Sequence, residues 1–338
     1  MPLDQILKVL PKIDVIGEIE RGFLALSEGK VEVPPVGELL FPEDNGELHI
    51  KYGAVRGDNV FVVKLATGFF NNPKLGLPPF SGCMLVLCAK TGKILFILLE
   101  EGELTNHRTA AAGAVVARHL APHRLEVIGI CGSGVQARLQ ADYLRRVTQC
   151  RTLVLWARDT ERAAHAVRDI ARMGYHARLA TSPEEVASSA QLIVTTTAAH
   201  EPYLLSRYIK PGTHVTAMGS DTPEKNEIDP AIFECAALVV ADSIPQCLLR
   251  GEIRAALAAG ALRREDVVEL GNVIAGGARR RSPEDITVAD LTGVAVQDIM
   301  IAKAVVVARK SALPDSSDLR GPLSAGSSNA TSRSKVTR

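Results

Sequence analysis

Residues 125–144 read LEVIGICGSGVQARLQADYL, and this stretch decides the fold of the chain. A short apolar run at 127–131 meets a glycine-rich turn, and a segment with helical character follows. The turn has the form G-x-G-x-x-A, which binds a dinucleotide when it joins a strand to a helix. A second apolar run, TLVLWARD at 152–159, begins about 20 residues later, as a βαβ unit of this kind requires. The residues of the turn are Gly132, Ser133, Gly134, Val135, Gln136 and Ala137.

Each position of this turn requires its residue type for a physical reason. Gly132 lets the chain leave the strand sharply, and Gly134 places no side chain between the backbone and a pyrophosphate. Ala137 allows the following helix to pack closely on the strand. The amide groups of residues 133–136 then face the pyrophosphate at the positive end of the helix dipole. The pattern therefore predicts a binding site for a redox dinucleotide.

The rest of the chain changes character around residue 122. From residue 125 onward, apolar runs and helical segments alternate, which is typical of a doubly wound parallel sheet. The regions before it are a helical pattern at 1–30, strand-like runs at 31–100 and an Ala-rich helical segment at 104–120. Beyond residue 262 the alternation fades, and a short extended piece and a long helix occupy 286–310. The strands expected in the parallel sheet are 125–130, 152–157, 176–180, 191–197, 213–218 and 237–241.

We therefore predict an α/β protein in which a Rossmann-type doubly wound parallel sheet is inserted into a strand-rich α+β domain. The first part of the strand-rich domain would span 1–122, and the nucleotide-binding domain would span 123–293. A closing helix at 294–312 would return to the first domain. Residues 313–338 are rich in Ser and lack apolar periodicity, so we expect a disordered tail there.

Composition excludes several classes of function. The 338 residues carry 39 basic and 38 acidic side chains, and a net charge of +1 favours neither nucleic acid nor an anionic membrane as a partner. The longest apolar runs, MLVLCA and ILFILL, are too short to span a membrane. The first residues resemble neither a secretory nor a transit signal. Six scattered cysteines without a C-x-x-C pair suit a reducing compartment and predict no metal site. We expect a cytoplasmic protein.

Three polar residues outside the turn are candidates for chemistry. Lys64 lies in the apolar run VVKLATG, where an unpaired buried charge is costly, although a lysine can also reach solvent from a strand edge. Arg108, near the start of the Ala-rich helix, offers a planar fork for a carboxylate or could form a surface ion pair. Asp221 follows the end of an expected strand, where doubly wound sheets bind ligands, but it could also cap a turn.

Several motifs at matching spacing give the chain a family resemblance. They are VKLATGFFNNPKLGLP at 63–78, ELTNHRTAAAGAVVARHLAP at 103–122, GSGVQA at 132–137, KPGTHVTAMGSDTPEKNEID at 210–229 and ITVADLTGVAVQD at 286–298. Together they are far more specific than the glycine-rich turn alone. The chain up to about residue 310 resembles the ornithine cyclodeaminase/mu-crystallin family.

This resemblance implies roles for the three candidates. Lys64 and Arg108 match the family positions that hold the substrate carboxylate, and Asp221 matches the acid that cyclodeaminases use at the reacting amine. The implied reaction takes hydride from Cα, closes a ring with loss of ammonia and returns the hydride, so that ornithine becomes proline without net consumption of NAD. The resemblance also implies a homodimer formed through the strand-rich domain.

The resemblance leaves other functions open. An alanine-type dehydrogenase or a reductase of cyclic imines such as pyrroline-2-carboxylate can use the same scaffold on a small α-amino acid or a cyclic imino acid. A mu-crystallin-like protein can bind NADP or another ligand without turnover. Asp221 counts against a mu-crystallin-like reductase, which usually lacks an acid there, but it does not count against a dehydrogenase.

The chain also departs from the family pattern. The cyclodeaminases often carry an arginine where this sequence has Val36, so a third carboxylate ligand is missing or is replaced by another residue such as Lys51. The closest counterpart of a family glutamate is His49, although a structural role for this histidine is the simpler interpretation. These changes preserve an α-amino acid as substrate but weaken the case for ornithine.

The second strand bears on the choice between NAD and NADP. Asp159 at its end could bond the ribose hydroxyls and repel a phosphate, whereas Arg158 matches an arginine of NADPH-using relatives. The sequence therefore favours NAD over NADP only slightly. Other residues that we expect near the nicotinamide are Thr195, Thr196, Met218, Gly219 and Thr292.

Overall fold

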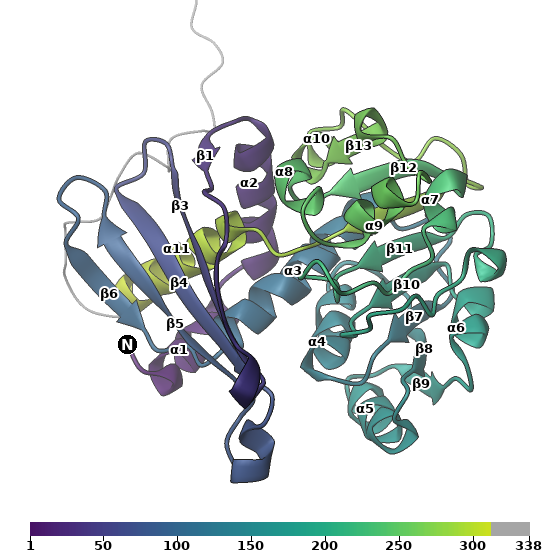
Figure 1. Cartoon of the computed structure of the whole chain (residues 1–338), viewed down its shortest axis with the longest axis horizontal. Helices are drawn as coiled ribbons and strands as arrows, with labels where there is room; N and C mark the ends of the chain where they lie inside the picture. The colour runs from purple at the N-terminus through teal and green to yellow at the C-terminus, as the bar shows by residue number, and fades with distance from the viewer. Residues whose placement is uncertain (312–338) are drawn as a thin grey trace, which may run out of the picture.

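The computed structural model describes residues 1–311, which form two sheets that lie side by side with helices packed on them (Figure 1). One sheet is antiparallel and is built from residues before Glu100. The other is parallel and begins at β7 (Ile128–Cys131), the strand that leads into the glycine-rich turn. The expected tail at 313–338 and residue 312 lie outside the described residues.

The antiparallel sheet has the order β1-β3-β4-β5-β6, with β2 paired to β3. Its strands alternate between a buried face and an exposed face, as the two-residue period of β structure requires. The helix α11, which follows the last strand of the parallel sheet, packs against β3, β4 and β5, and it also contacts α2 and α3 (Figure 1). The strands are β1 (Val31–Glu32), β2 (Gly37–Phe41), β3 (Gly46–Val55), β4 (Val60–Phe69), β5 (Phe80–Cys88) and β6 (Ile94–Leu98), and the helices are α1 (Leu3–Val9), α2 (Val15–Ser27), α3 (Glu103–Leu120) and α11 (Ala295–Ser311).

The parallel sheet has eight strands in the order β13-β12-β14-β11-β10-β7-β8-β9. The order in which strands are added reverses at β7: β8 and β9 lie on one side of it, and β10 and β11 lie on the other. Such a switch point opens a crevice at the carboxyl ends of β7 and β10. The strands after β7 are β8 (Thr152–Trp156), β9 (His176–Leu179), β10 (Leu192–Thr195), β11 (His214–Ala217), β12 (Ala236–Ala241), β13 (Val267–Glu269) and β14 (Ile286–Asp290). The helices of this half are α4 (Val135–Leu144), α5 (Thr160–Arg172), α6 (Pro183–Ser189), α7 (Ala231–Cys235), α8 (Ile244–Cys247), α9 (Glu252–Ala258) and α10 (Leu270–Ile274).

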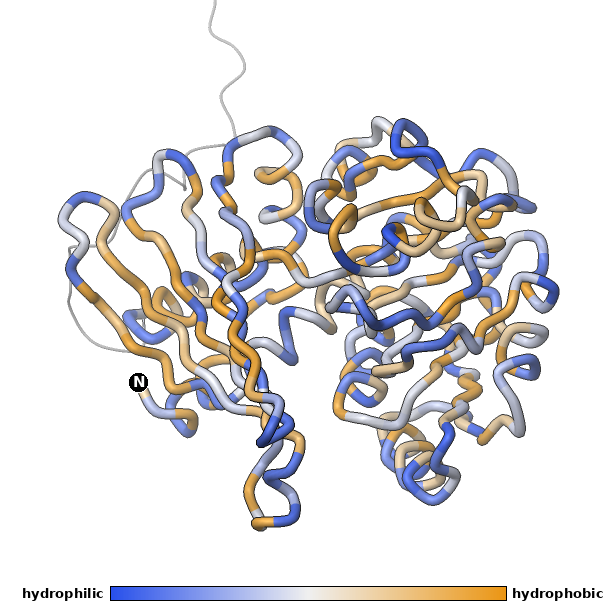
Figure 2. The backbone as a smooth tube through the Cα atoms, in the orientation of Figure 1, coloured by the Kyte–Doolittle hydropathy of each residue, from blue (hydrophilic) through white to orange (hydrophobic). Residues whose placement is uncertain are grey.

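Apolar burial explains this layering. Figure 2 shows the strands of both sheets largely in the hydrophobic colour and most connecting turns in the hydrophilic colour. The central strands β7, β10 and β11 are buried along their whole length, as expected for parallel strands covered on both faces. Among residues 1–311, no helix is both long enough and apolar enough to cross a membrane.

The structure confirms the predicted fold class and corrects two details of the prediction. The helical pattern at 1–30 is split into α1 and α2, because Pro11 interrupts it within a 3-10 turn and Asp14 starts α2 by accepting a bond from the Gly17 amide at 3.0 Å. The parallel sheet also does not end at residue 241. The extended piece at 286–290 is β14, which lies between β12 and β11 inside the sheet.

The position of α11 bears on the domain boundaries. It follows β14 directly in sequence but packs on the antiparallel sheet, so the chain returns to its first half (Figure 1). We propose that the two sheets are the cores of two domains with boundaries near residues 122 and 293, as the sequence predicts.

Candidate active site

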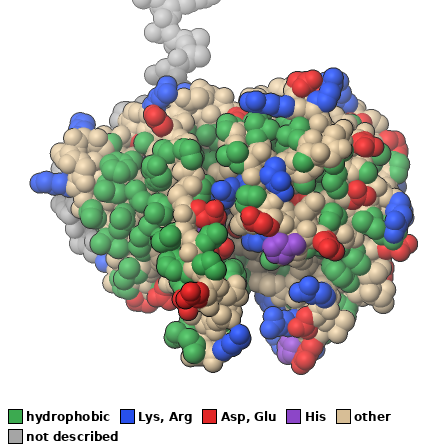
Figure 3. All heavy atoms as spheres, viewed as in Figure 1, with side chains coloured by type: hydrophobic (Ala, Val, Ile, Leu, Met, Phe, Trp, Pro, Cys, Tyr) green, Lys and Arg blue, Asp and Glu red, His purple; other side chains and the backbone are tan. Residues whose placement is uncertain are grey.

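A cleft of about 390 Å³ lies where the antiparallel sheet faces the carboxyl ends of β7, β10 and β11. Figure 3 shows this opening between the two halves, with charged side chains of both signs around it. Residues of β3, β4 and α3 form one wall, and the glycine-rich turn and the loops after β10 and β11 form the other. The cleft therefore lies between the two halves, where a ligand would contact both.

The glycine-rich turn fits a dinucleotide. Gly132 has φ of 128°, and a Cβ there would lie 2.2 Å from Thr196 Oγ1, so only glycine is accommodated. A Cβ on Gly134 would meet no atom within 4 Å, because this residue faces the open cleft. Ala137 is fully buried behind the turn. The backbone can thus approach a pyrophosphate closely at the N-terminus of α4.

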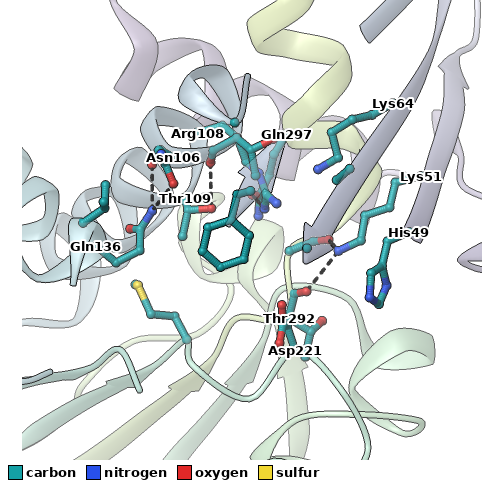
Figure 4. Close-up of a pocket in the computed structure, with 18 of the residues that line it drawn as sticks. His49, Lys51, Lys64, Asn106, Arg108, Thr109, Gln136, Asp221, Thr292 and Gln297 are labelled. Atoms are coloured by element: carbon teal, nitrogen blue, oxygen red, sulfur yellow. Dashed lines mark hydrogen bonds between the residues drawn. The ribbon is translucent and has the colours of Figure 1, made fainter. Parts of the chain in front are cut away.

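Three buried cations converge on the opposite wall (Figure 4). Lys51 and Lys64 are direct partners on the antiparallel strands β3 and β4, an arrangement that is unfavourable for like charges. Arg108 reaches them from α3. The carboxylate of Asp298, from α11, holds the group together: its Oδ1 lies 2.9 Å from Lys64 Nζ and 3.2 Å from Arg108 Nε.

Lys51 has weaker partners than Lys64. Its Nζ donates to the carbonyl oxygens of Gly293 at 2.5 Å and Thr292 at 3.4 Å (Figure 4). Burial, together with repulsion from Lys64 and Arg108, lowers the pKa of Lys51 to about 7. The lysine is therefore poised between its charged and neutral forms near neutral pH, and an anionic ligand in the cleft would favour the charged form.

Asp221 lies across from these cations, beneath Lys51 and His49 in Figure 4. Its side chain is 51% exposed, and Oδ1 forms an ion pair with Lys225 at 2.5 Å. Enclosure by the cleft raises the pKa of Asp221, but Lys225, Lys51 and His49 outweigh this effect and hold the pKa below its usual range. Asp221 is therefore an ionised acceptor that faces the cleft.

Buried carboxylates fix the loop that carries Asp221. Glu227 accepts the Gly219 amide at 2.8 Å and the hydroxyl groups of Thr195 and Thr197, each at 2.7 Å. Glu252 accepts the amide of Glu227 at 2.8 Å and also binds the hydroxyl of Ser220. This network ties the carboxyl ends of β10 and β11 to α9, so the acid is presented by a rigid support.

Comparisons with known proteins agree with this geometry. A model of the ornithine cyclodeaminase/mu-crystallin family matches residues 5–311. The chain belongs to this family. It is 42% identical over 292 residues to a putative dehydrogenase of Rhizobium meliloti, which covers 86% of this chain and 88% of the relative. It is also 42% identical over 295 residues to an uncharacterized cyclodeaminase of Sinorhizobium fredii, which covers 86% of this chain and 89% of that relative.

A solved structure of the same fold is an archaeal alanine dehydrogenase dimer with bound NAD. The two chains superimpose with a TM-score of 0.84 and 30% identity, over 92% of this chain and 96% of the other. The predicted family resemblance is therefore confirmed, and the relatives differ among themselves in the activity that their names state.

The structure brings most of the residues predicted from the ornithine cyclodeaminase/mu-crystallin pattern to one cleft. The lining residues among them are His49, Lys51, Lys64, Arg108, Gly134, Val135, Gln136, Thr196, Met218, Asp221 and Thr292. His49 lies between Glu38 and Glu47, with ring nitrogens 3.7 and 3.5 Å from their carboxylates. The ring faces the cleft, and its Nε2 is buried without a hydrogen-bond partner among residues 1–311.

Other predicted residues lie elsewhere. Thr195 is fully buried and donates to Glu227, so its side chain does not reach the cleft as we expected. Gly219 is likewise behind the wall, where its amide donates to the same carboxylate. Ser133 borders a second cavity, next to α5, and Asp159 caps the N-terminus of α5.

Several polar residues at the cleft were not predicted from the sequence, among them the lining residue Gln297 and the buried Asp298 behind it. Asp298 and Gln297 lie on α11, which reads as an apolar closing helix. Gln297 accepts from Arg108 Nη1 at 2.5 Å, and its Nε2 is buried without a hydrogen-bond partner among residues 1–311. The available signal was the adjacent pair Gln297-Asp298 within an otherwise apolar run, because buried polar residues on such a face require a partner.

Proposed function

We propose that this protein catalyses hydride exchange between a nicotinamide dinucleotide and the Cα atom of a small α-amino acid or its imino form. The observation that carries the proposal is the charge at the cleft wall, where the three cations Lys51, Lys64 and Arg108 lie beside two buried carboxylates, those of Asp298 and Glu100. This surplus of buried positive charge suits a ligand carboxylate. The glycine-rich turn across the cleft suits the cofactor.

The roles of the residues follow from their positions. Lys64 and Arg108 would bind the α-carboxylate and orient Cα–H toward the cofactor side of the cleft. Gln297 Nε2, which has no hydrogen-bond partner within the described residues 1–311, offers a further donor at the same place. Asp221 would accept a proton from the α-ammonium or from a water when the amino acid is oxidised, and return it in the reverse direction. A nicotinamide, when bound, would supply the hydride acceptor or donor.

The fate of the imino acid separates two candidate activities. In an ornithine cyclodeaminase the side-chain amine attacks the imine carbon, ammonia leaves, and the cyclic imine is reduced to proline. In an amino-acid dehydrogenase or imine reductase the hydride is exchanged only once. Lys51 does not separate the two activities, because cyclodeaminases often carry a third cation themselves, the arginine expected at the position of Val36.

A product analysis distinguishes these activities. The purified protein is incubated with ornithine and a small amount of NAD or NADP, and ammonia, proline and reduced cofactor are measured. Ammonia and proline without net cofactor reduction support the cyclodeaminase. Net reduction with alanine supports a dehydrogenase, and oxidation of NADPH or NADH by pyrroline-2-carboxylate supports a reductase. Absence of turnover in a panel of amino and imino acids would favour a ligand-binding protein instead.

The pKa of Lys51 predicts a pH dependence of substrate binding. Because its pKa is about 7, Lys51 is cationic below that pH and increasingly neutral above it. If it assists the substrate carboxylate, KM should rise by about tenfold between pH 6 and pH 9, since a charge-assisted hydrogen bond is lost. The KM of K51R should depend much less on pH, because arginine stays charged. If the KM of the wild type and the KM of K51R changed with pH to the same extent, Lys51 would have no role in carboxylate binding.

We also propose a homodimer formed through the antiparallel sheet. The face of this sheet opposite α11 exposes apolar side chains, and Figure 3 shows a broad hydrophobic area over these strands. Such an area is unusual on a monomer and is typical of an interface. The archaeal relative named as a dimer supports a second copy of this chain as the occupant. The exposed apolar residues on and next to these strands include Leu39, Leu40, Ile94, Leu95, Ile97 and Leu99.

Substitutions in this face test the dimer. The double variant I94D/I97D should elute as a monomer in size-exclusion chromatography with light scattering, because two carboxylates cannot be desolvated in an apolar interface. The matched control is L249D, which alters a similarly exposed leucine in the other half of the molecule and should leave the mass unchanged. A monomeric wild-type protein would refute the proposed interface.

A further inference from the structure

The turn between β14 and α11 joins the two halves of the molecule at the cations of the cleft wall. It spans residues 291–294, and Thr292 and Gly293 within it line the cleft. Its backbone supplies the acceptors of Lys51, which are the carbonyl oxygens of Gly293 at 2.5 Å and Thr292 at 3.4 Å (Figure 4). The position of this turn therefore sets the position of the Lys51 ammonium group.

Arg108 depends on the same turn. Gly293 has φ of 79°, and a Cβ there would lie 2.6 Å from Arg108 Nη1 and 3.1 Å from Nη2. The guanidinium group thus packs directly on the backbone of this glycine. The helix α11 begins two residues later and carries Gln297 and Asp298, which bind the same guanidinium group. A displacement of the turn would therefore move the acceptors of Lys51 and the seat of Arg108 together.

A carboxylate that does not line the cleft holds this turn from the other side. Asp242 follows the end of β12 in the parallel sheet and is 1% exposed. Its Oδ2 accepts the Gly293 amide at 2.8 Å, and its Oδ1 accepts the Thr292 hydroxyl at 3.0 Å. Its own amide donates to the carbonyl of Asp290, the last residue of β14, at 3.1 Å. Asp242 thus ties the turn to two neighbouring strands of the parallel sheet.

One peptide group connects Asp242 with Lys51. The amide of Gly293 donates to Asp242, and the carbonyl of Thr292, which belongs to the same peptide group, accepts from Lys51. A carboxylate at one end of such a chain polarises the peptide group and strengthens the acceptor at its other end. Asp242 therefore favours the charged form of Lys51 through the backbone of the turn.

The charge of Asp242 is held by its surroundings. Burial raises the pKa of Asp242, but hydrogen bonds from Gly293, Thr292 and Cys247 and attraction from Lys51 oppose this rise. Because both carboxylate oxygens accept hydrogen bonds, the arrangement suits the ionised form. The other charged groups that act on Lys51 or Asp242 are Lys64 on β4, Arg108 on α3, Asp298 on α11, Asp221 after β11 and Asp290 on β14.

From these contacts we propose that Asp242 is a positioning residue for the substrate carboxylate, because it fixes the turn at 291–294 so that Lys51 and Arg108 are aligned for binding. Asp242 acts through the turn and does not itself touch the substrate. A residue of the parallel sheet would thus control a site whose cations lie on β3, β4 and α3. The inference rests on the proposed function and adds a residue to its carboxylate site.

Steady-state kinetics of D242N test this proposal. Asparagine keeps the shape but turns an NH2 group toward one of the two donors of the turn, so at least one bond to the turn is lost. KM for the amino acid should rise about 10- to 100-fold, as expected when a hydrogen bond to a buried charge is lost. The value of kcat should stay within about threefold, because the carboxylate is bound equally in the ground state and the transition state.

A matched control comes from the same cluster. Cys247 Sγ is a third donor to Asp242 Oδ1, at 3.4 Å, but it makes no bond to the backbone of the turn. C247A therefore leaves both bonds between Asp242 and the turn intact. It should change neither KM nor kcat by more than about twofold.

The pH profile separates this role from a general structural one. Removal of the Asp242 charge should lower the pKa of Lys51, since a nearby anion favours the ammonium form. The rise of KM with pH should therefore begin about 0.5 pH unit or more lower in D242N than in the wild type. In K51R/D242N the KM should depend little on pH, because arginine stays charged. A fold that is merely loosened would raise KM without displacing this profile.

T292V provides a second test if D242N does not fold. It removes the hydroxyl donor but keeps the carboxylate and the bond from the Gly293 amide, so KM should rise by only about 3- to 10-fold. Melting curves show whether each variant is folded. An unchanged KM in either folded variant, or a pH profile of D242N that is not displaced, would overturn the role of Asp242. Absence of turnover of any amino or imino acid by the wild type would instead refute the proposed function.

Discussion

Replacement of Asp221 by asparagine should reduce turnover of the amino acid by about 10²- to 10⁴-fold, the contribution of a positioned general acid or base. Asparagine has nearly the same shape but cannot accept a proton, and the Asp221 side chain faces the cleft rather than the core. The dissociation constant of the nicotinamide nucleotide should stay within about twofold of the wild-type value, because the glycine-rich turn is untouched. Steady-state kinetics and a fluorescence titration on the same preparation provide both quantities.

The matched control for this variant is E224Q. Glu224 lies on the same loop and is exposed, but its side chain does not line the cleft. Its substitution should leave kcat and nucleotide binding unchanged. If D221N turned over at a rate close to that of the wild type, or if E224Q lost as much activity, Asp221 would not be the proton acceptor.

Replacement of Asp298 by asparagine should lower the free energy of unfolding by about 3–5 kcal/mol, the usual cost of removing one partner from a buried ion pair. Asp298 is 1% exposed, and it contacts both Lys64 and Arg108. Burial opposes its ionisation, but attraction from Lys64, Arg108 and Lys51 holds its pKa below the usual range. Without this carboxylate, Glu100 would be the buried acid left beside three cations. Urea denaturation followed by circular dichroism measures the loss.

A ligand carboxylate should partly replace the missing one. High concentrations of a bound amino acid or of a carboxylate inhibitor should therefore stabilise D298N more than they stabilise the wild type. The control is D266N, which removes an exposed carboxylate from the surface pair with Arg263 and should leave the unfolding free energy nearly unchanged. A loss below about 1 kcal/mol in D298N would contradict the view that Asp298 neutralises this wall.

Local sequence patterns predicted much of the fold. The apolar run before Gly132 and the alternation that follows it were sufficient for a doubly wound parallel sheet, because buried strands and amphipathic helices have different periods. The pattern failed where an element is short or is paired far away in sequence. β13 has three residues, and β14 joins the sheet between two strands that precede it by many residues.

The sequence predicted some residues of the candidate site but not the partners that position them. Lys64 was recognisable because a charge within an apolar strand needs a partner, but the sequence could not identify that partner as Asp298, 234 positions away. The sequence likewise could not show that Glu227 binds Thr195 and Gly219 and so fixes them behind the cleft rather than within it. Asp159 was predicted as a ribose ligand from its place after a strand end, and the tertiary structure adds that its side chain caps α5.

By itself, then, the sequence determined the doubly wound sheet and its glycine-rich turn, because the turn at Gly132 and Gly134 is a local feature whose backbone geometry depends on neighbouring residues. The tertiary structure alone decided how charge is distributed in the cleft. Lys51 and Lys64 become neighbours only when β3 pairs with β4, and Asp298 reaches them only because α11 packs on that sheet. Electrostatic interactions depend on distance and burial rather than on sequence order, so folding had to supply them.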